Sequence, residues 1–298
     1  MDFKQIEAFV NVVKYKSFSK AADASFLTQP TISTHISTLE KEFGTRLIDR
    51  CSKEALPTKQ GKLLFKYAIN MLNMREKATF SLKSFTNEIE GILEIQASSV
   101  PGEYMVPSLI TKFREKYPKV KFYLEQSDSS NVENNILEQK GEIGFIGYKG
   151  NNSSLLYEKL TTDKIVLITP QNEKFINLKG QKIELGDFID EPFVWREQGS
   201  ATRKEFEDKI SDLGYSKQMN VVARMNSMEA IKQAVSNGLG ISIISKIAIE
   251  NNLDNREFLT FEIKEINLDR EFYLVRNKNI ALSPTAEMFK EFVLNNMK

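Results

Sequence analysis

Residues 17–50 contain the pattern that most restricts how this chain can fold. They predict two short helices joined by a tight turn, because apolar residues recur at helical spacing on both sides of a polar break. The second helix is predicted to start at Thr28-Gln29-Pro30, since a capping residue ahead of a proline marks a first helical turn. The small apolar face of the first helix consists of Phe18, Ala21, Ala22 and Ala24.

The second helix of this pair has two different faces. A glycine, Gly44, is expected to end it. Its apolar stripe, predicted to be buried, consists of Ile32, Ile36, Leu39 and Phe43. The opposite face carries Thr31, Ser33, Thr34, His35, Ser37 and Thr38. Short donors and acceptors of this kind can reach phosphates and base edges in a major groove. A polar surface helix without a partner is the alternative interpretation.

Many positions of this N-terminal segment agree, in fixed register, with one protein family. The chain resembles the LysR-type transcriptional regulators, and the resemblance in length and order of segments covers essentially the whole chain. The matching residues are Phe3, Phe9, Ser17, Phe18, Ala21, Ala22, Leu27, Gln29, Pro30, Ile32, Ser33, Ile36, Leu39, Glu40, Gly44, Leu47 and Arg50. One position departs: the family usually has Arg where this chain has Thr34, so a phosphate contact from that position is not carried over.

The resemblance implies a winged helix-turn-helix domain at residues 1–58, covered by an amphipathic first helix. Two short strands around a turn, at 47–53 and 56–58, would form the wing. Lys59 also lies where the family's wing approaches the DNA backbone. DNA contact is predicted for Thr28, Gln29, Pro30, Thr31, Ser33, Thr34, Ser37, Arg50 and Lys53. A solvated surface charge is the alternative for each basic residue. Cys51 in the wing leaves open a redox switch or a small apolar side chain.

Residues 59–88 predict a long linker helix, helical from 59 to about 87. At about 1.5 Å per residue it would be roughly 40 Å long, too long for a winged-helix domain. Its apolar positions are Leu63, Leu64, Tyr67, Ala68, Met71, Leu72, Met74, Ala78, Leu82 and Phe85. In the resembled family this helix pairs with its copy in a second subunit. The resemblance therefore implies a homodimer through this helix, and also the homotetramer of the family. A helix lying along its own domain is the alternative.

Strand and helix signals alternate from residue 91 onward, which predicts an α/β fold with largely parallel sheets. Strands are predicted at 92–97, 120–126, 143–147, 155–160, 165–169, 193–195, 221–223, 241–244 and 272–275. Helices are predicted at 105–116, 132–139, 201–213, 228–237, 246–251 and 284–295. The order resembles the family's two-lobed, periplasmic-binding-protein-like sensor domain at 91–298. Lobe I would comprise about 91–161 and 267–298, and lobe II about 162–266, with two crossovers between them.

Three hydroxyl-rich turns each follow a predicted strand and lead into a helix, at 98–104, 127–131 and 196–203. Ligands of open α/β sheets bind beyond the carboxyl ends of strands, often at helix N-termini. Effector contacts are therefore predicted for Ser98, Ser99, Val100, Ser129, Ser130, Gln198, Ser200 and Thr202, of which Ser98 and Thr202 match the family's ligand-binding positions. Helix capping alone is the alternative role of such hydroxyls.

The three turns also resemble a clostridial-type branch of the family tied to sulfur or selenium metabolism, and more loosely the cysteine-biosynthesis regulators. That likeness implies a small anion or an amino-acid derivative, such as an acylated serine, as effector. Two carboxylates qualify this expectation. Asp128 and Glu103 would repel an anion if they faced it, so they point away or select for an amino group.

Composition narrows the function classes. The 298 residues carry a formal net charge of +1, so no global basic field indicates nucleic acid, although a local site can still be basic. A single cysteine cannot form an intramolecular disulfide. The N-terminus lacks a signal-peptide pattern, and no apolar run approaches about 20 residues. These features favour a cytoplasmic protein without a membrane partner.

An enzyme is not expected. The only histidine, His35, lies in the predicted recognition helix, and the sequence has no Cys/His metal set, Walker pattern or GxSxG motif. No catalytic residue, metal or cofactor is predicted, and nothing points to a Ser/Lys or carboxylate-pair catalyst. The expected partners are double-stranded DNA, a small effector, further copies of the chain and RNA polymerase. A cytosolic small-molecule-binding protein without sequence-specific DNA binding is the alternative function.

Overall fold

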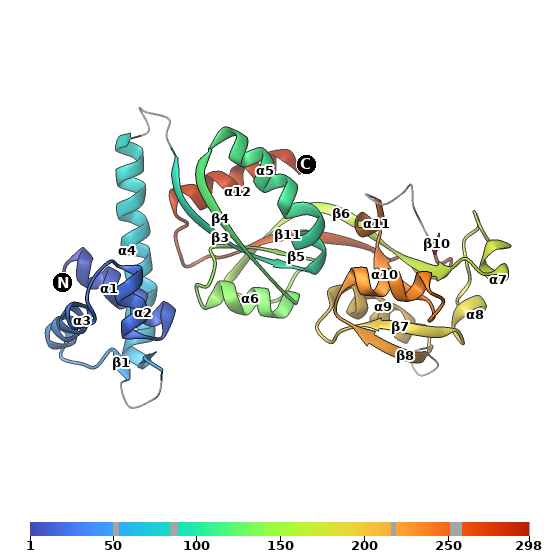
Figure 1. Ribbon diagram of the computed structural model, residues 1–298, viewed down its shortest axis with the longest axis horizontal. Coiled ribbons are helices and arrows are strands. Elements are labelled where there is room, and N and C mark those ends of the chain that lie inside the picture. Colours follow the sequence, from blue (N-terminus) through green and yellow to red (C-terminus); the bar gives the residue numbers. More distant parts are fainter. Residues whose placement is uncertain (50–53, 84–88, 216–218, 251–257, 298) are drawn as a thin grey trace.

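A small helical domain at the N-terminus stands beside a two-lobed α/β domain, with helix α4 between them (Figure 1). The computed structural model describes residues 1–49, 54–83, 89–215, 219–250 and 258–297. The N-terminal elements are α1 (Phe3–Tyr15), α2 (Phe18–Ala24), α3 (Gln29–Phe43), β1 (Ile48–Asp49) and β2 (Leu56–Pro57), followed by α4 (Lys59–Lys83).

Local capping sets the ends of α3 where the sequence predicted them. The Thr28 side chain accepts a hydrogen bond from the Thr31 N–H, and Gly44 adopts a left-handed φ of 62° at the other end. Ile32, Ile36 and Leu39 are fully buried. The prediction was wrong for Phe43, which is 44% exposed because it lies in the last turn, beyond the three-helix core. Ala24, at the end of α2, is exposed for the same reason.

Each lobe has an apolar core of its own, and a further cluster joins Val100 and Met105 of lobe I to residues of lobe II. Lobe I contains β3 (Glu90–Ser98), α5 (Val106–Lys116), β4 (Lys119–Ser127), α6 (Ser129–Leu137), β5 (Ile143–Ile146) and α12 (Pro284–Asn296). Lobe II contains α7 (Glu173–Ile176), α8 (Leu185–Phe188), β7 (Pro192–Arg196), α9 (Ala201–Asp212), β8 (Asn220–Met225), α10 (Met228–Ser236), β9 (Ser242–Ser245), α11 (Ile247–Glu250) and β10 (Phe258–Phe261). A π-helix, Pro101–Met105, leads into α5.

Two long strands cross between the lobes, β6 (Leu155–Pro170) and β11 (Asp269–Asn277). The prediction of separate strands at 155–160 and 165–169 was wrong. The polar residues between them suggested a break, but β6 continues because β11 pairs with it antiparallel along this stretch, with one register shift between Phe272 and Tyr273. Two crossovers were predicted, and β6 and β11 are these connections.

The sheets are mixed, whereas largely parallel sheets were predicted. β3 pairs parallel with β4 and β5, and β7 pairs parallel with β8. In contrast, β6 pairs antiparallel with β9, β10 and β11. Of these, β11 carries the chain back to lobe I and therefore runs opposite to β6. Helix α6 begins at Ser129, not 132, since Asp128 caps it. The short elements α7, α8 and β10 were not predicted.

Helix α4 is fastened to lobe I of its own chain through the loop that follows β11. Asn70 Nδ2 donates to the Asn279 carbonyl at 3.1 Å, and the Ala281 N–H donates back to Asn70 Oδ1 at 2.7 Å. Asn73 Nδ2 also donates to the Ala281 carbonyl, at 2.6 Å. The predicted residues 84–87 of this helix, Phe85 among them, lie outside the described part of the chain.

Candidate functional site

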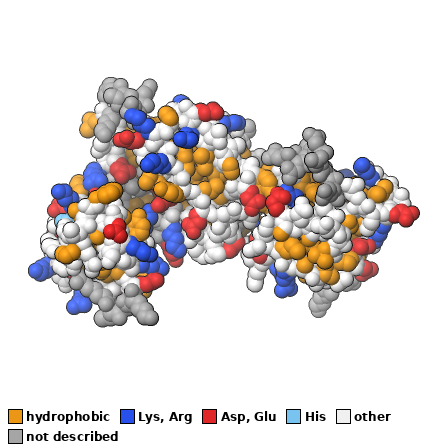
Figure 2. Space-filling model, viewed as in Figure 1, with side chains coloured by type: hydrophobic (Ala, Val, Ile, Leu, Met, Phe, Trp, Pro, Cys, Tyr) orange, Lys and Arg blue, Asp and Glu red, His pale blue; other side chains and the backbone are white. Residues whose placement is uncertain are grey.

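Helix α3 carries the N-terminal candidate contacts on its solvent side, while its apolar side packs in the three-helix core. Arg50 and Lys53 of the predicted wing, and Cys51, lie outside the described residues. The exposed candidates are Thr28, Gln29, Pro30 and Thr34, and the half-buried ones are Thr31, Ser33 and Ser37. Lysines and arginines are interspersed with acidic residues over the face shown in Figure 2, without one large basic patch.

Hydrogen bonds divide this polar face into engaged and available groups. Thr34 Oγ1 donates to the Pro30 carbonyl at 2.9 Å, and Thr38 Oγ1 donates to the Thr34 carbonyl at 2.9 Å. Ser19 Oγ donates to Gln29 Oε1 at 3.0 Å, which orients the Gln29 amide and leaves its NH₂ group directed elsewhere. Ser33 forms no side-chain hydrogen bond within the described residues. Ser33 and the Gln29 amide are therefore the groups most free to contact a partner.

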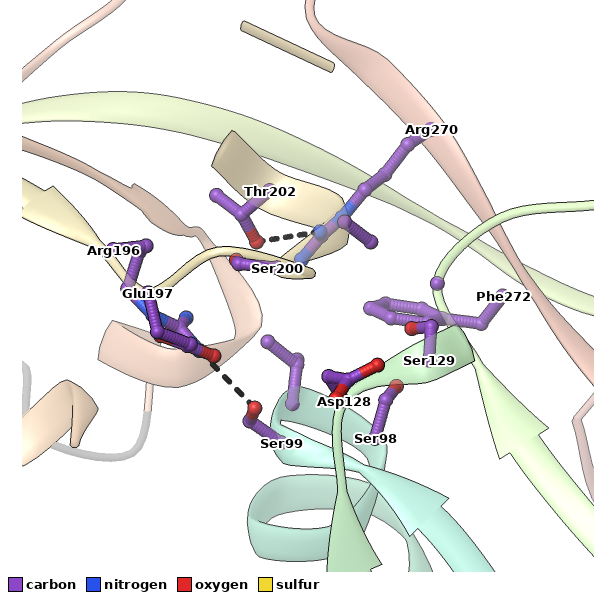
Figure 3. Close-up of a pocket in the computed structure, with 13 residues that line it drawn as sticks. Ser98, Ser99, Asp128, Ser129, Arg196, Glu197, Ser200, Thr202, Arg270 and Phe272 are labelled. Atoms are coloured by element: carbon purple, nitrogen blue, oxygen red, sulfur yellow. Dashed lines mark hydrogen bonds and ion pairs between the residues drawn. The ribbon is translucent and has the colours of Figure 1, made fainter. Parts of the chain in front are cut away.

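A cavity between the lobes lies where β3, β4 and β7 end (Figure 3). The space within it is about 270 Å³ when the open solvent at its mouth is included. Two helices begin at its wall, α6 capped by Asp128 and α9 capped by Ser200. Their first N–H groups have no partner within the helix, and the helix dipole places partial positive charge there. The lining residues are Ser98, Ser99, Val100, Asp128, Ser129, Gly147, Arg196, Glu197, Ser200, Ala201, Thr202, Arg270 and Phe272.

Arg196 joins the two lobes across this cavity. Its side chain is buried and forms a two-pronged pair with Glu197, with Nε and Nη2 each 2.8 Å from a carboxylate oxygen. Nη2 also donates to Ser99 Oγ of lobe I at 3.1 Å. A change in the angle between the lobes therefore has to break or remake the Arg196–Ser99 hydrogen bond.

Arg270 is held by a buried carboxylate. Its Nε donates to Asp163 Oδ2 at 2.8 Å, and its Nη1 donates to Thr202 Oγ1 at 2.7 Å. Burial lowers the pKa of the Arg270 guanidinium, while the charge of Asp163 opposes that shift. Asp163 also accepts from Ser245 Oγ at 2.7 Å. This network links both crossing strands to the N-terminus of α9.

The hydroxyl of Ser129 at the cavity wall is buried without a hydrogen-bond partner among the described residues. Ser129 is only 1% exposed, and its Oγ has no hydrogen-bond partner in the described structure. Buried polar groups are nearly always hydrogen-bonded in native proteins, so an unpartnered hydroxyl at a cavity wall indicates a site for a bound molecule or water. Its position in the first turn of α6 favours a polar ligand.

The structure brings most of the predicted effector residues together. Ser98, Ser99, Val100, Ser129, Ser200 and Thr202 line the cavity. Ser130 and Gln198 instead line an adjoining pocket, which shares Ser200 and Ala201 with the cavity and also includes Tyr148, Gly199, Arg203, Lys204 and Glu207. Burial raises the pKa of Tyr148 there. Glu103 points elsewhere and accepts from Gln126 Nε2 at 2.9 Å, whereas Asp128 lines the cavity.

Sequence reasoning missed the two arginines and Phe272. A signal for Arg270 was present, because Arg270, Phe272 and Leu274 are all buried strand residues of β11. An arginine among the apolar, buried positions of a strand needs a buried partner. Nothing in the sequence identifies that partner as Asp163, which lies 107 positions away.

Other kinds of site find no support in the described part of the chain. No group of three or more His, Cys, Asp or Glu side chains there is arranged to hold a metal ion. None of the described helices combines the length and hydropathy needed to cross a bilayer.

Comparison with known proteins agrees with this architecture. Residues 3–62 match the model of the bacterial regulatory helix-turn-helix protein, lysR family, and residues 86–298 match the LysR substrate binding domain. The HTH-type transcriptional regulator MJ0300 of Methanocaldococcus jannaschii is 33% identical over 288 residues, 96% of each chain. CysL of Bacillus subtilis, also an HTH-type transcriptional regulator, is 28% identical over 99% of this chain and 98% of its own.

Among solved structures, a full-length OxyR variant from Pseudomonas aeruginosa superposes with a TM-score of 0.78 at 17% identity. The match covers 100% of this chain and 94% of that chain. It extends the similarity in fold over the winged helix-turn-helix, the long helix and both lobes.

Proposed function

The chain belongs to the LysR family of DNA-binding transcriptional regulators, and from this premise we propose that a small polar effector, bound between its lobes, adjusts how the winged helices of an oligomer contact DNA. The observation that carries the proposal is the cavity between the lobes, which has a buried, unpartnered Ser129 hydroxyl in its wall and is bridged by the Arg196–Ser99 hydrogen bond. Such a site can respond to a ligand by changing the lobe arrangement. A DNA-binding regulator acts where the chromosome is, so we place the protein in the cytoplasm.

We propose that α3 reads the operator through Gln29 and Ser33. Ser33 forms no side-chain hydrogen bond among the described residues, and the hydrogen bond from Ser19 to Gln29 uses only the amide oxygen of Gln29. The wing and nearby lysines would supply salt-dependent affinity by neutralising phosphates. Ser33→Ala should lower the ratio of specific to non-specific DNA binding, measured by mobility shift at two salt concentrations. Thr38→Ala is the matched control, because its hydroxyl already donates to the Thr34 carbonyl. An unchanged ratio for Ser33→Ala would count against this role.

Oligomer formation is proposed to run through α4. One side of this helix packs on the N-terminal core, where Ala68 is 1% exposed. Another stripe of large apolar residues faces solvent, with Leu63 60%, Tyr67 61%, Met74 60% and Leu82 79% exposed. An apolar stripe of this length at helical spacing is suited to a second helix. A two-fold dimer would present two winged helices to a two-fold operator, and a tetramer would present more.

The link from cavity to DNA is proposed to follow β11. Arg270 and Phe272 line the cavity at one end of this strand, and the loop after its other end is hydrogen-bonded to Asn70 and Asn73 of α4. A shift of β11 relative to lobe I is therefore transmitted to the helix that positions the DNA-binding domain. Coupling can only be as large as the effector's preference for one arrangement, typically about 1–3 kcal/mol.

The effector class is proposed to be a small anion or an amino-acid derivative connected with sulfur metabolism. The support is the hydroxyl-rich lining together with the near full-length match to CysL. Thermal unfolding against sulfate, sulfite, thiosulfate, selenite, O-acetylserine and N-acetylserine tests it. A ligand at about 100 times its dissociation constant adds about 2.7 kcal/mol of stability. A shift that disappears in Ser98→Ala locates the ligand in the cavity, whereas no shift with any compound contradicts the sulfur assignment.

A further inference from the structure

The formal charges around the cavity do not favour a simple anion. Its lining contains two arginines, and each is already paired with a carboxylate, Arg196 with Glu197 and Arg270 with Asp163. These pairs cancel. The remaining charged lining residue is Asp128, which has no Lys or Arg within ion-pair distance among the described residues. The described wall of the cavity therefore carries one uncompensated negative charge.

The carboxylate of Asp128 is fixed in place by the fold. It caps α6, accepting from the Asn131 N–H at 3.0 Å and from the Asn131 side-chain amide. It also lies against the turn of lobe II, because a methyl group added at Gly199 would be 3.1 Å from Asp128 Cγ. Gly199 has a φ of 93°, which lets that turn approach. Asp128 therefore lies at the boundary between the lobes, where a bound ligand would contact both (Figure 3).

The same cavity offers separate groups for a negatively charged or acceptor end. The unpartnered Ser129 hydroxyl is available as a donor. The first N–H groups of α9, after its cap Ser200, lack helical partners and lie at the positive end of the helix dipole. Donors and one carboxylate within a single small cavity suit a molecule that has both an acidic and a basic group.

We propose that the effector is a small zwitterion with a free ammonium group, an amino acid or a side-chain derivative of one, whose ammonium contacts Asp128 and whose carboxylate contacts Ser129 and the N-terminus of α9. This rests on the proposed function, since it assumes that this cavity binds the effector. It narrows the effector classes above, because simple oxyanions and N-acylated amino acids lack the ammonium group. A ligand held in this way contacts both lobes, because Asp128 and Ser129 belong to lobe I and α9 belongs to lobe II.

The test compares two isomers in which the acetyl group is on the hydroxyl or on the amine, so that only one of them has a free amine. O-acetyl-L-serine has a free ammonium at neutral pH, and N-acetyl-L-serine does not. The standard amino acids are tested in the same way beside their N-acetyl forms, and sulfate is included as a plain anion. Binding to the full-length protein is measured by calorimetry. Asp128→Asn removes the charge and keeps a capping side chain. Asp2→Asn is the matched control, because Asp2 caps α1 far from the cavity.

The expected result is that at least one free-amine compound binds, that its N-acetyl form binds more weakly, and that Asp128→Asn lowers its affinity by about tenfold or more. Asp2→Asn should bind as the wild type does. Binding of sulfate or an N-acetyl form that is equal or stronger than that of the free amines would overturn the zwitterion while leaving the cavity as effector site. An absence of binding by every free-amine compound would also overturn the zwitterion proposal. Binding that is unaffected by both Asp128→Asn and Ser129→Ala would place the ligand outside the cavity and reject the proposed function as well.

Discussion

Removing Asp163 should destabilise lobe II strongly, because it leaves a buried guanidinium without its counter-charge. Asp163 is fully buried at its side chain, and the Arg270 side chain is 4% exposed. Asp163→Ala removes the ion pair and also the acceptor of the Ser245 hydroxyl. Breaking a buried pair by deleting one partner costs about 3–5 kcal/mol. Thr202 cannot replace the lost charge.

Urea unfolding, monitored by tryptophan fluorescence, measures this loss of stability in lobe II. The chain has one tryptophan, Trp195, which is 4% exposed in the core of lobe II. With a slope of about 2 kcal/mol per molar urea, the loss corresponds to a midpoint lower by about 2 M. The fluorescence transition therefore reports on lobe II even if the N-terminal domain unfolds separately.

A second variant separates the charge effect from lost packing. In Asp163→Ala/Arg270→Met the unpaired charge is gone and an apolar side chain fills much of the space. Replacement of buried pairs by apolar residues is often neutral or stabilising. The double variant should therefore recover most of the lost stability. The reasoning is refuted if Asp163→Ala loses less than about 1 kcal/mol, or if the double variant is no more stable than the single one.

Three further outcomes are expected. Burial raises the pKa of Glu142 above its ordinary value of 4.5, so the folded state binds this proton more tightly, and the stability of the wild type should fall relative to that of Glu142→Gln as pH rises above 4.5. Urea unfolding at about pH 4.5 and about pH 7 measures the stability difference between the two proteins, and the same difference at both pH values would contradict the prediction. Tyr67→Glu with Met74→Glu should reduce the mass seen by light scattering, whereas Lys66→Glu, on the exposed surface of the same helix, should not. Asn70→Ala should weaken the effect of effector on DNA binding while leaving effector affinity of the free protein nearly unchanged, and undiminished coupling would exclude this loop as the link.

The helix-turn-helix was predictable because its determinants are local. A cap at Thr28, a proline in the first turn and a left-handed glycine, Gly44, each act within a few residues of the chain. The stripe of Ile32, Ile36 and Leu39 follows from helical spacing alone. The error at Phe43 has a matching cause, since periodicity identifies the face of a helix but not where the core beneath it ends.

The cavity was predictable only in part. Serines and threonines after strands indicated three turns, and the carboxyl ends of neighbouring strands bring such turns together. Whether a given turn residue lines the cavity or the adjoining pocket depends on where the helix starts. Helix α6 begins at Ser129, so Ser129 faces the cavity and Ser130, the next residue of the same turn, faces the adjoining pocket.

Sequence alone determined the family, the order of segments and the ends of the capped helices, because these depend on patterns within a few turns of chain. Tertiary structure decided which charges are cancelled. Asp163 and Arg270 meet only because β6 and β11 cross between the lobes side by side, and this pairing leaves Asp128 as the uncompensated charge of the described cavity wall. Electrostatic pairing depends on distance in space, and a sequence contains no measure of distance between residues so far apart along the chain.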